Sequence, residues 1–453
     1  MTGAPLGWVG IVRLGLVQTA LGAIVVLTTA TLNRVMVVEL ALPATLPGAL
    51  VAWHYAVQML RPRWGYGSDV SGRRTPWIVG GMAILALGGV TAALATAWMG
   101  TNRPAGIALA VAAFGLIGIG VGAAGTSLLV LLAKRVEPRR RAAAATIVWL
   151  MMIAGFVVTA TVAGSLLDPF SLTRLVTVTA VVSLAAFVLA TLAVWGVEGS
   201  AAAPVPLNDD AAGEPKPRFL EALAQVWAEP KARRFAVFVF VSMLAYSAQD
   251  LILEPFAGTV FGLTPGESTK LSGVQHGGVL VGMILVALAG SAIGGPRLGS
   301  MRTWTVAGCL ASAAALAGLA FGGTVGPGWP LRPSVFALGV ANGAFAVAAI
   351  GSMMGLADAG RERREGVRMG LWGAAQAIAF GLGGLLGTVA VDVTRYLLGT
   401  PATAYATVFV AEAALFLVSA VLAARVSQPG TDATADLQLT AAGDGLAAGI
   451  SGR

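Results

Sequence analysis

The chain has 453 residues, of which 57% are hydrophobic and only 11% charged, and its mean hydropathy is +0.82. Soluble domains carry about a quarter charged residues, so the composition excludes a soluble protein and predicts one that crosses a membrane several times. The net charge of +8 does not indicate nucleic-acid binding, because the basic residues lie in short loops between apolar runs. The single cysteine, Cys309, excludes an intrachain disulfide and a metal–thiolate cluster.

Apolar segments of about 20 residues, the length that crosses the hydrocarbon core, recur twelve times. The first has no small-residue cleavage site, so we expect an uncleaved helix and not a signal peptide. The predicted spans are 14–37, 42–60, 77–99, 105–132, 142–166 and 174–197 in the first half of the chain. In the second half they are 235–257, 271–293, 303–322, 334–357, 369–391 and 402–424.

The two sets of six spans are separated by a stretch of different composition. It begins with EGSAAAPVPLNDDAAGEPKPRF, which is typical of a flexible linker. FLEALAQVWAEP follows with apolar residues at helical spacing, which predicts a short amphipathic helix on the membrane surface. We therefore expect a six-helix half at 1–197, a cytoplasmic linker at 198–234, a second six-helix half at 235–425 and a disordered tail at 426–453.

The basic residues predict the orientation of the chain. Most of the 29 Lys and Arg residues fall on one side of the predicted membrane, and the other side carries only Arg34, Arg103, Arg174, Lys270, Arg332 and Arg395. Both termini and the linker are therefore predicted to be cytoplasmic.

The two halves also resemble each other in sequence. NRVMVVEL, at the end of the first span, resembles QDLILEPF at the end of the seventh, and GRRTPW returns as GSMRTW. The basic run KRVEPRRR before the fifth span is matched by RERREGVR before the eleventh. Such a parallel repeat is typical of transporters whose functional cavity lies between the halves.

The loop after the second span, RPRWGYGSDVSGRRTP, carries Gly65, Asp69, Gly72, Arg73 and Arg74 at the spacing G-x-x-x-D-x-x-G-R-R. These residues resemble the loop signature of the major facilitator superfamily. The fold class predicted is therefore an all-α membrane protein of the major facilitator type, with twelve helices in two pseudo-symmetric halves. The equivalent loop of the second half, GGPRLGSMR, has no acid, which argues against a fully symmetric cytoplasmic gate.

Acidic residues inside the seventh span, SAQDLILEPF, are costly in a membrane and usually face a partner or a water-filled path. Asp250 and Glu254 are four residues apart and so share one helix face. Asn33 and Arg34, in the first span, reach a comparable depth. One interpretation is a gate in which Arg34, with Asn33 beside it, pairs with Asp250 or Glu254 and clamps the outer ends of the halves.

The eighth span opens with LSGVQHGGVL, which brings Gln275 and His276 to the depth of Asp250. We expect Gly273, Gly277 and Gly278 to leave the helix surface beside His276 bare, so that a flat ligand or another helix could lie there. A neutral imidazole is a good metal ligand, including for the magnesium of a chlorin ring. The alternative is a packing histidine held by hydrogen bonds. Because the sequence has no catalytic motif, we do not expect an enzyme.

The stretch SAQDLILEPFAGTVFGLTPGESTKLSGVQHGGVL, together with TLNRVMVVEL, strongly resembles the bacteriochlorophyll-delivery branch of the major facilitator superfamily, the PucC-like light-harvesting assembly proteins. Gln249, Asp250, Glu254, Pro255, Gln275 and His276 match that family's signature. The resemblance implies a multi-pass protein of a bacterial inner membrane, cytoplasmic or intracytoplasmic and photosynthetic.

The resemblance further implies that the protein binds bacteriochlorophyll or a precursor and delivers it to light-harvesting or reaction-centre polypeptides. The partners implied are membrane lipid, those polypeptides, and the pigment or its late biosynthetic machinery, with no nucleic acid. The candidate pigment contacts are His276, Gln275, Gly277, Asp250 and Gln249, with His276 as the axial ligand to the chlorin magnesium.

Two other functions stay open on the sequence. The first is a proton-coupled transporter of a small solute, in which Asp250 and Glu254 would titrate. The second is a non-transporting membrane scaffold for complex assembly. Proton-dependent uptake abolished by Asp250→Asn would favour the transporter, and copurification with an apoprotein but never with pigment would favour the scaffold.

Overall fold

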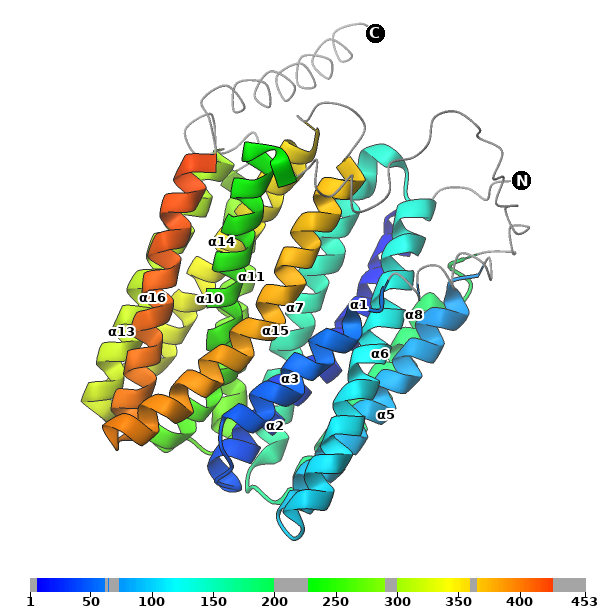
Figure 1. The fold of residues 1–453 in the computed structure, drawn as a ribbon. Coiled ribbons are helices and arrows are strands. Elements are labelled where there is room, and N and C mark those ends of the chain that lie inside the picture. The colour runs from blue at the N-terminus through cyan, green and yellow to red at the C-terminus, as the bar shows by residue number, and fades with distance from the viewer. Residues whose placement is uncertain are drawn as a thin grey trace, which may run out of the picture.

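The computed structural model describes residues 6–61, 64, 73–198, 227–289, 300–358 and 365–426. These residues are almost entirely helical, and the long helices stand side by side in a bundle (Figure 1). Eleven helices in the described ranges are long and apolar enough to cross a membrane. The helix at the predicted second span, α3, has 14 residues. The prediction of an all-α, multi-pass membrane protein is confirmed.

The first predicted span is one continuous helical rod whose outer part is π-helical in two places. The helices of the first half are α1 (Trp8–Val26), η1 (Leu27–Thr31), α2 (Leu32–Arg34), η2 (Val35–Glu39), α3 (Thr45–Gln58), α5 (Thr75–Met99), α6 (Arg103–Arg135), α7 (Arg141–Leu167) and α8 (Leu172–Val194). Those of the second half are α10 (Pro230–Phe261), α11 (Pro265–Ala289), α13 (Met301–Val325), α14 (Leu331–Asp358), α15 (Glu365–Leu398) and α16 (Pro401–Val426).

Prolines mark where several of these helices begin. Pro76, Pro104 and Pro230 lie in the first turns of α5, α6 and α10. A first-turn residue needs no backbone N–H donor, and the fixed φ of proline suits that position. Pro255 is different because it lies inside α10, where it removes a helical hydrogen bond.

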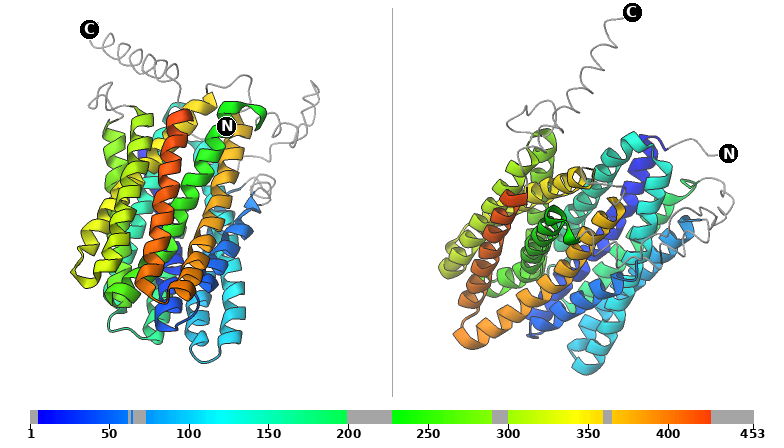
Figure 2. Two further views of the ribbon diagram at one scale, coloured as in Figure 1. Left: turned by 60° about the vertical axis from the view of Figure 1, so that its left-hand side comes forward. Right: turned by 45° about the horizontal axis from the view of Figure 1, so that its top comes forward.

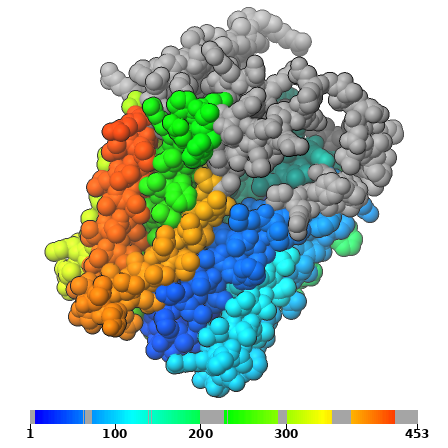
Figure 3. All heavy atoms as spheres, in the orientation of Figure 1, coloured from blue at the N-terminus to red at the C-terminus, as the bar shows by residue number. Residues whose placement is uncertain are grey.

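The helices of the two halves pack in the same pattern. In the first half α5 packs on α6 and α8, α1 packs on α7 and α8, and α3 packs on α6. In the second half α13 packs on α14 and α16, α10 packs on α15 and α16, and α11 packs on α14. Between the halves α7 packs on α11, and α15 packs on α3, which Figure 3 shows as two rods in contact along their length. The packing therefore repeats with the order of the spans, as the sequence repeat predicts.

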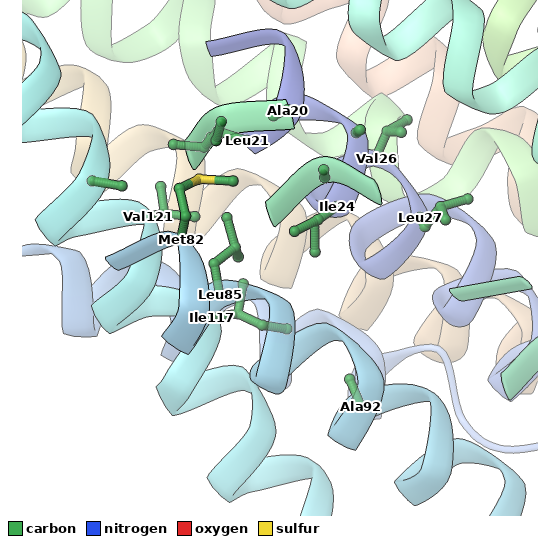
Figure 4. Close-up of a cluster of buried hydrophobic side chains, with 14 of the residues drawn as sticks. Ala20, Leu21, Ile24, Val26, Leu27, Met82, Leu85, Ala92, Ile117 and Val121 are labelled. Carbon is green, nitrogen blue, oxygen red and sulfur yellow. The ribbon is translucent and has the colours of Figure 1, made fainter. Parts of the chain in front are cut away.

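Each half has its own apolar core. Figure 4 shows part of the first, where side chains of α1, α5 and α6 such as Leu21, Met82 and Ile117 meet. Small residues allow this approach, since a Cβ atom at Gly120 would lie 2.5 Å from the backbone nitrogen of Leu85. Close packing of this kind is what holds helices together in lipid, where burial from water contributes little.

Some predictions fall on residues that the structure does not describe. They are the linker up to residue 226, the tail from residue 427, and Gly65, Asp69 and Gly72 of the loop motif. The division into 1–197, 198–234, 235–425 and 426–453 and the cytoplasmic placement of the termini therefore stay predictions. Figure 2 shows the same bundle from two further directions.

Of the loop motif, the structure describes Arg73, which is exposed, and Arg74, which is buried at the start of α5. The Glu198 carboxylate accepts hydrogen bonds from the backbone N–H groups of Arg74 and Thr75, the latter at 2.8 Å. A carboxylate thus caps the N-terminus of the third span, where negative charge is favoured, and it comes from the end of the sixth span.

Candidate functional site

The halves meet through polar contacts at one end of the bundle, which we call the outer end because the sequence predicts it to be non-cytoplasmic. The connections α7–α8, α10–α11 and α15–α16 lie there (Figure 1). Every hydrogen bond between the halves that the structure describes lies within about one-third of the helix length from this end.

Asn33 repairs the break that Pro255 makes in α10. Because proline has no N–H, the Leu251 carbonyl four residues earlier loses its helical partner. The Asn33 amide, from α2 in the other half, donates a hydrogen bond to that carbonyl. A buried carbonyl without a partner is costly, so this contact compensates for the hydrogen bond that Pro255 removes.

Arg34 closes the end of the same helix. It is 2% exposed, and its guanidinium donates a hydrogen bond of 2.6 Å to the Leu263 carbonyl, just past the C-terminus of α10. A cation is favoured at a helix C-terminus. A Cβ atom at Gly258 would lie 3.0 Å from the Arg34 Nε, so glycine leaves room for the guanidinium.

The predicted ion pair between Arg34 and Asp250 or Glu254 is wrong. Arg34 forms its ion pair with Glu39, five residues further along its own helical rod. In a π-helix hydrogen bonds join residues five apart, so the π-helical segment η2 brings position 39 above position 34. Arg34 still joins the two halves, through Leu263, and it interacts electrostatically with Glu254.

Two aspartates join the halves in the same way on opposite sides of the bundle. Asp392, in α15, accepts hydrogen bonds from the backbone N–H groups of Ala44 and Thr45 at 3.0 and 2.8 Å and from the Thr45 hydroxyl at 2.7 Å. These groups form the N-terminus of α3, so the carboxylate of one half caps a helix of the other.

Asp168, at the end of α7, does the same for α11. Its carboxylate accepts from the Thr264 hydroxyl at 2.9 Å and from the Gly266 backbone N–H at 3.3 Å. Since α7 and α15 are the fifth and eleventh spans, and α11 and α3 the eighth and second, the two caps are related by the repeat. The sequence interpretation missed both aspartates. Their signals were an acid in each of these helices near its outer end and the similar helix starts TPG at 264–266 and TLPG at 45–48.

Deeper in the bundle the structure brings together the residues predicted for the seventh and eighth spans. The Gln275 amide donates to Asp250 at 3.4 Å. Asp250 lies eleven residues before the end of α10, and His276 lies eleven residues after the start of α11. At 1.5 Å per residue both are roughly 16 Å from the outer end, about half-way across a bilayer core. Tyr55 and Tyr246 interact electrostatically with Asp250.

Two other predicted site residues are buried without partners. Gln249 is fully buried, and within the described structure neither atom of its amide has a hydrogen-bond partner. Glu254 is 2% exposed; Ser268 and Ser272 lie beside it, but neither of its oxygens accepts a hydrogen bond of normal geometry from a described residue. A buried polar group or ion without a partner is costly, so Gln249 and Glu254 do not have the contacts of structural cross-links.

His276 is held in one tautomer by its own helix. Its Nδ1 lies 2.8 Å from the Ser272 carbonyl oxygen, and a carbonyl can only accept, so Nδ1 carries the proton. In the neutral imidazole the lone pair is then on Nε2, for which the described residues provide no hydrogen-bond partner. The ring is half-buried and meets the Phe156 ring of α7 edge to face, with centroids 4.9 Å apart.

The glycines beside His276 differ from one another. A Cβ atom at Gly277 would meet no atom within 4 Å, so this surface is open as predicted. Gly278 is covered by α14, where a Cβ atom would lie 2.3 Å from the Phe336 carbonyl oxygen, and Gly273 is covered by α7 next to Thr161. The expectation of a wholly bare face is therefore wrong. Two of the three glycines serve helix packing, and the free surface is confined to Gly277.

Comparison with known proteins agrees with this architecture. The sequence matches the model of a protein family described as "PUCC protein" over residues 31–431. The chain belongs to the PucC family. It is 56% identical to the "Bacteriochlorophyll synthase 44.5 kDa chain" of Rhodobacter capsulatus, over 93% of this chain and 96% of that protein. It is 30% identical to "Protein PucC" of the same organism, over 93% of this chain and 92% of that one.

Among solved structures, the peptide transporter POT in complex with sulfate matches with a TM-score of 0.69 and 15% identity, over 94% of this chain and 97% of that one. This likeness shows the fold alone. It confirms the prediction of a major-facilitator-type fold, and the family match confirms the resemblance to the PucC-like proteins.

Proposed function

We propose that this PucC-family protein is a non-catalytic pigment carrier, which binds bacteriochlorophyll or a late precursor between its two halves. Nε2 of His276 coordinates the chlorin magnesium, and the protein hands the pigment to light-harvesting or reaction-centre polypeptides in the membrane. Family membership and the name of the 56% identical relative support a role connected with bacteriochlorophyll. The transporter-type fold supports carriage in preference to catalysis.

The observation that carries the proposal is the hydrogen bond from His276 Nδ1 to the Ser272 carbonyl. A metal-binding histidine usually donates its other ring N–H to a carbonyl or carboxylate, which orients the ring and makes the free nitrogen more basic. Nε2 of His276 has no described hydrogen-bond partner, so its lone pair is free to bind a metal.

The surroundings of His276 also suit a large flat ligand. Gly277 offers open surface next to the imidazole, and Phe156 supplies an aromatic ring on the facing helix of the other half. Asp250 and Gln275, at the same depth, offer polar groups to the substituents of a chlorin ring. The described residues contain no group of three His, Cys, Asp or Glu side chains that could hold a metal ion alone. We therefore expect the magnesium to be bound as part of the chlorin ring.

The first test is the absorption spectrum of the protein purified in mild detergent from cells that make bacteriochlorophyll. We expect bound pigment in the parent protein and loss or a spectral shift in His276→Ala. His54→Ala is the matched control, since His54 is the other histidine of the chain and its ring is engaged by Gln58 at 2.8 Å. Equal amounts of pigment in all three proteins would show that His276 is not a ligand. If none of the three proteins contains pigment, the carrier function is wrong.

A second variant tests the open surface without touching the histidine. Gly277→Leu places a side chain where the structure has space, so the fold should be kept while pigment is displaced. Thermal unfolding of the pigment-free protein supplies the control for folding. Pigment retained at the parent level in Gly277→Leu would place the ring elsewhere.

The buried, unpartnered carboxylate of Glu254 favours a second candidate function, a proton-coupled transporter. Solute uptake that requires a pH gradient and is abolished by Glu254→Gln, in a protein that never carries pigment, would replace the carrier by the transporter.

A further inference from the structure

A third acidic residue, Glu412, lies inside the second half on a helix that carries none of the proposed pigment contacts. It is 2% exposed, and within the described structure neither carboxylate oxygen has a hydrogen-bond partner. Glu412 is eleven residues from the start of α16, so it lies roughly 16 Å from the outer end, at the depth of Asp250.

Among the described side chains, those at the depth of Glu412 offer no positive charge. Helix α16 packs on α10, α13 and α15. Besides Glu412 itself and Asp250, the titratable and charged side chains described on these four helices are Arg233, Arg234, Tyr246, Glu254, Arg302, Cys309, Asp392, Arg395, Tyr396, Tyr405 and Arg425. The arginines all lie in end turns, and the group that interacts electrostatically with Glu412 is the carboxylate of Asp250.

A second unpartnered polar group occurs at this level. Gln249 precedes Asp250 in α10, is fully buried, and has no described partner for either amide atom. A neutral carboxyl group both donates and accepts a hydrogen bond, as a carboxamide does, whereas a carboxylate can only accept. Neither buried group has a described partner, so no described donor compensates a negative charge on Glu412.

We propose that Glu412 is a proton-binding site, at which the carboxylate takes up one proton from solvent and keeps it at neutral pH in the conformation seen here. An ionised carboxylate without a cation or a hydrogen bond is too costly in a low-dielectric interior, and a negative charge on Asp250 would add to that cost. The Asp250–Glu412 pair then carries at most one negative charge. Glu412 itself is not one of the proposed pigment contacts.

The test is infrared spectroscopy of the pigment-free, full-length protein at neutral pH, which detects the C=O stretch of a protonated carboxyl group. We expect this band in the parent protein, its loss or marked decrease in Glu412→Gln, and its retention in Glu267→Gln, a control acid at the start of α11 that accepts from the Thr264 N–H. In Asp250→Asn the band should persist but change in frequency. A Glu412→Gln spectrum that matches the parent would overturn the proposal.

A protein with ¹³C-labelled glutamate provides the answer even where Glu412→Gln does not fold. Labelling shifts the bands of glutamate and leaves those of aspartate, and the Glu254→Gln background removes the other buried, unpartnered glutamate among the described residues. A protonated-carboxyl band that still shifts assigns the proton to Glu412, and the lack of any shifting band shows that Glu412 is ionised.

Discussion

Carboxylates in two regions of this molecule have opposite surroundings. At the outer end Asp168 and Asp392 accept hydrogen bonds from the starts of helices in the other half. Deeper in the bundle Glu254 and Glu412 are buried with no described hydrogen-bond partner. Asp168 and Asp392 have the contacts expected of a cross-link between the halves. Glu254 and Glu412 lack such contacts, as expected of groups that bind a proton or a ligand. Residue type alone does not separate structure from function here, whereas hydrogen-bond partners do.

The largest loss of stability should come from replacing Arg34, whose guanidinium joins the two halves at the outer end. In Arg34→Met the Leu263 carbonyl and Glu39 both lose their partner, so we expect unfolding to become easier by about 1.5–3 kcal/mol. Thermal unfolding in detergent measures this loss. Arg174→Met is the control, since the Arg174 side chain is partly exposed and its described hydrogen bond is to the Pro169 carbonyl of its own half. Equal stability of the two variants would contradict the role of Arg34.

The two aspartate caps should differ in strength. Loss of a helix cap costs about 0.5–2 kcal/mol, and Asp392 makes three short hydrogen bonds whereas Asp168 makes two, one of them at 3.3 Å. We therefore expect Asp392→Ala to lower the thermal midpoint more than Asp168→Ala. A reversed order would show that the two caps are not the equivalents that the repeat suggests.

Glu254→Gln tests a buried carboxyl group that has no described hydrogen-bond partner. A carboxyl group without a hydrogen bond has little to lose, so the free energy of unfolding should change by less than about 1 kcal/mol. Measured beside Asp392→Ala in the same detergent, it should be the milder change. A loss as large as that of the cap would mean that Glu254 is a structural group.

The smallest expected effect concerns Glu198, the cap of α5. Burial raises the pKa of this carboxyl, but hydrogen bonds from the Thr75 and Arg74 backbone outweigh it, and the net pKa is lowered from 4.5. A lowered folded-state pKa contributes stability above the unfolded-state value, and that stability is lost as the pH falls through the folded-state value. Thermal midpoints of the parent should therefore drop slightly more than those of Glu198→Gln when the pH is taken below about 4.5. Parallel curves would show that the cap does not contribute.

Much of the fold could be predicted from the sequence because it rests on local signals. Apolar run lengths and prolines near the starts of helices mark the spans, and the repeat of NRVMVVEL and QDLILEPF predicts matching halves. The Asp250–Gln275 contact could also be predicted, since it needs only equal depth in adjacent spans.

The partners of Arg34, Asp168 and Asp392 could not be predicted in this way. The Arg34–Glu39 pair depends on a π-helical segment, which has no recognisable pattern in VMVVE. The aspartate caps depend on how one half docks on the other, and helical periodicity carries no information on that. For the same reason the sequence could not distinguish the open Gly277 from the covered Gly273 and Gly278.

The central claim is that His276 binds the metal of a pigment, and it is tested most directly by comparing pigments with and without the metal. The purified protein and His276→Ala are titrated with bacteriochlorophyll and with its magnesium-free counterpart, and the four Kd values are measured. The parent should prefer the magnesium pigment by about tenfold or more, about 1.4 kcal/mol per factor of ten, and His276→Ala should bind both pigments equally. An equal preference for the magnesium pigment in parent and variant would contradict ligation by His276.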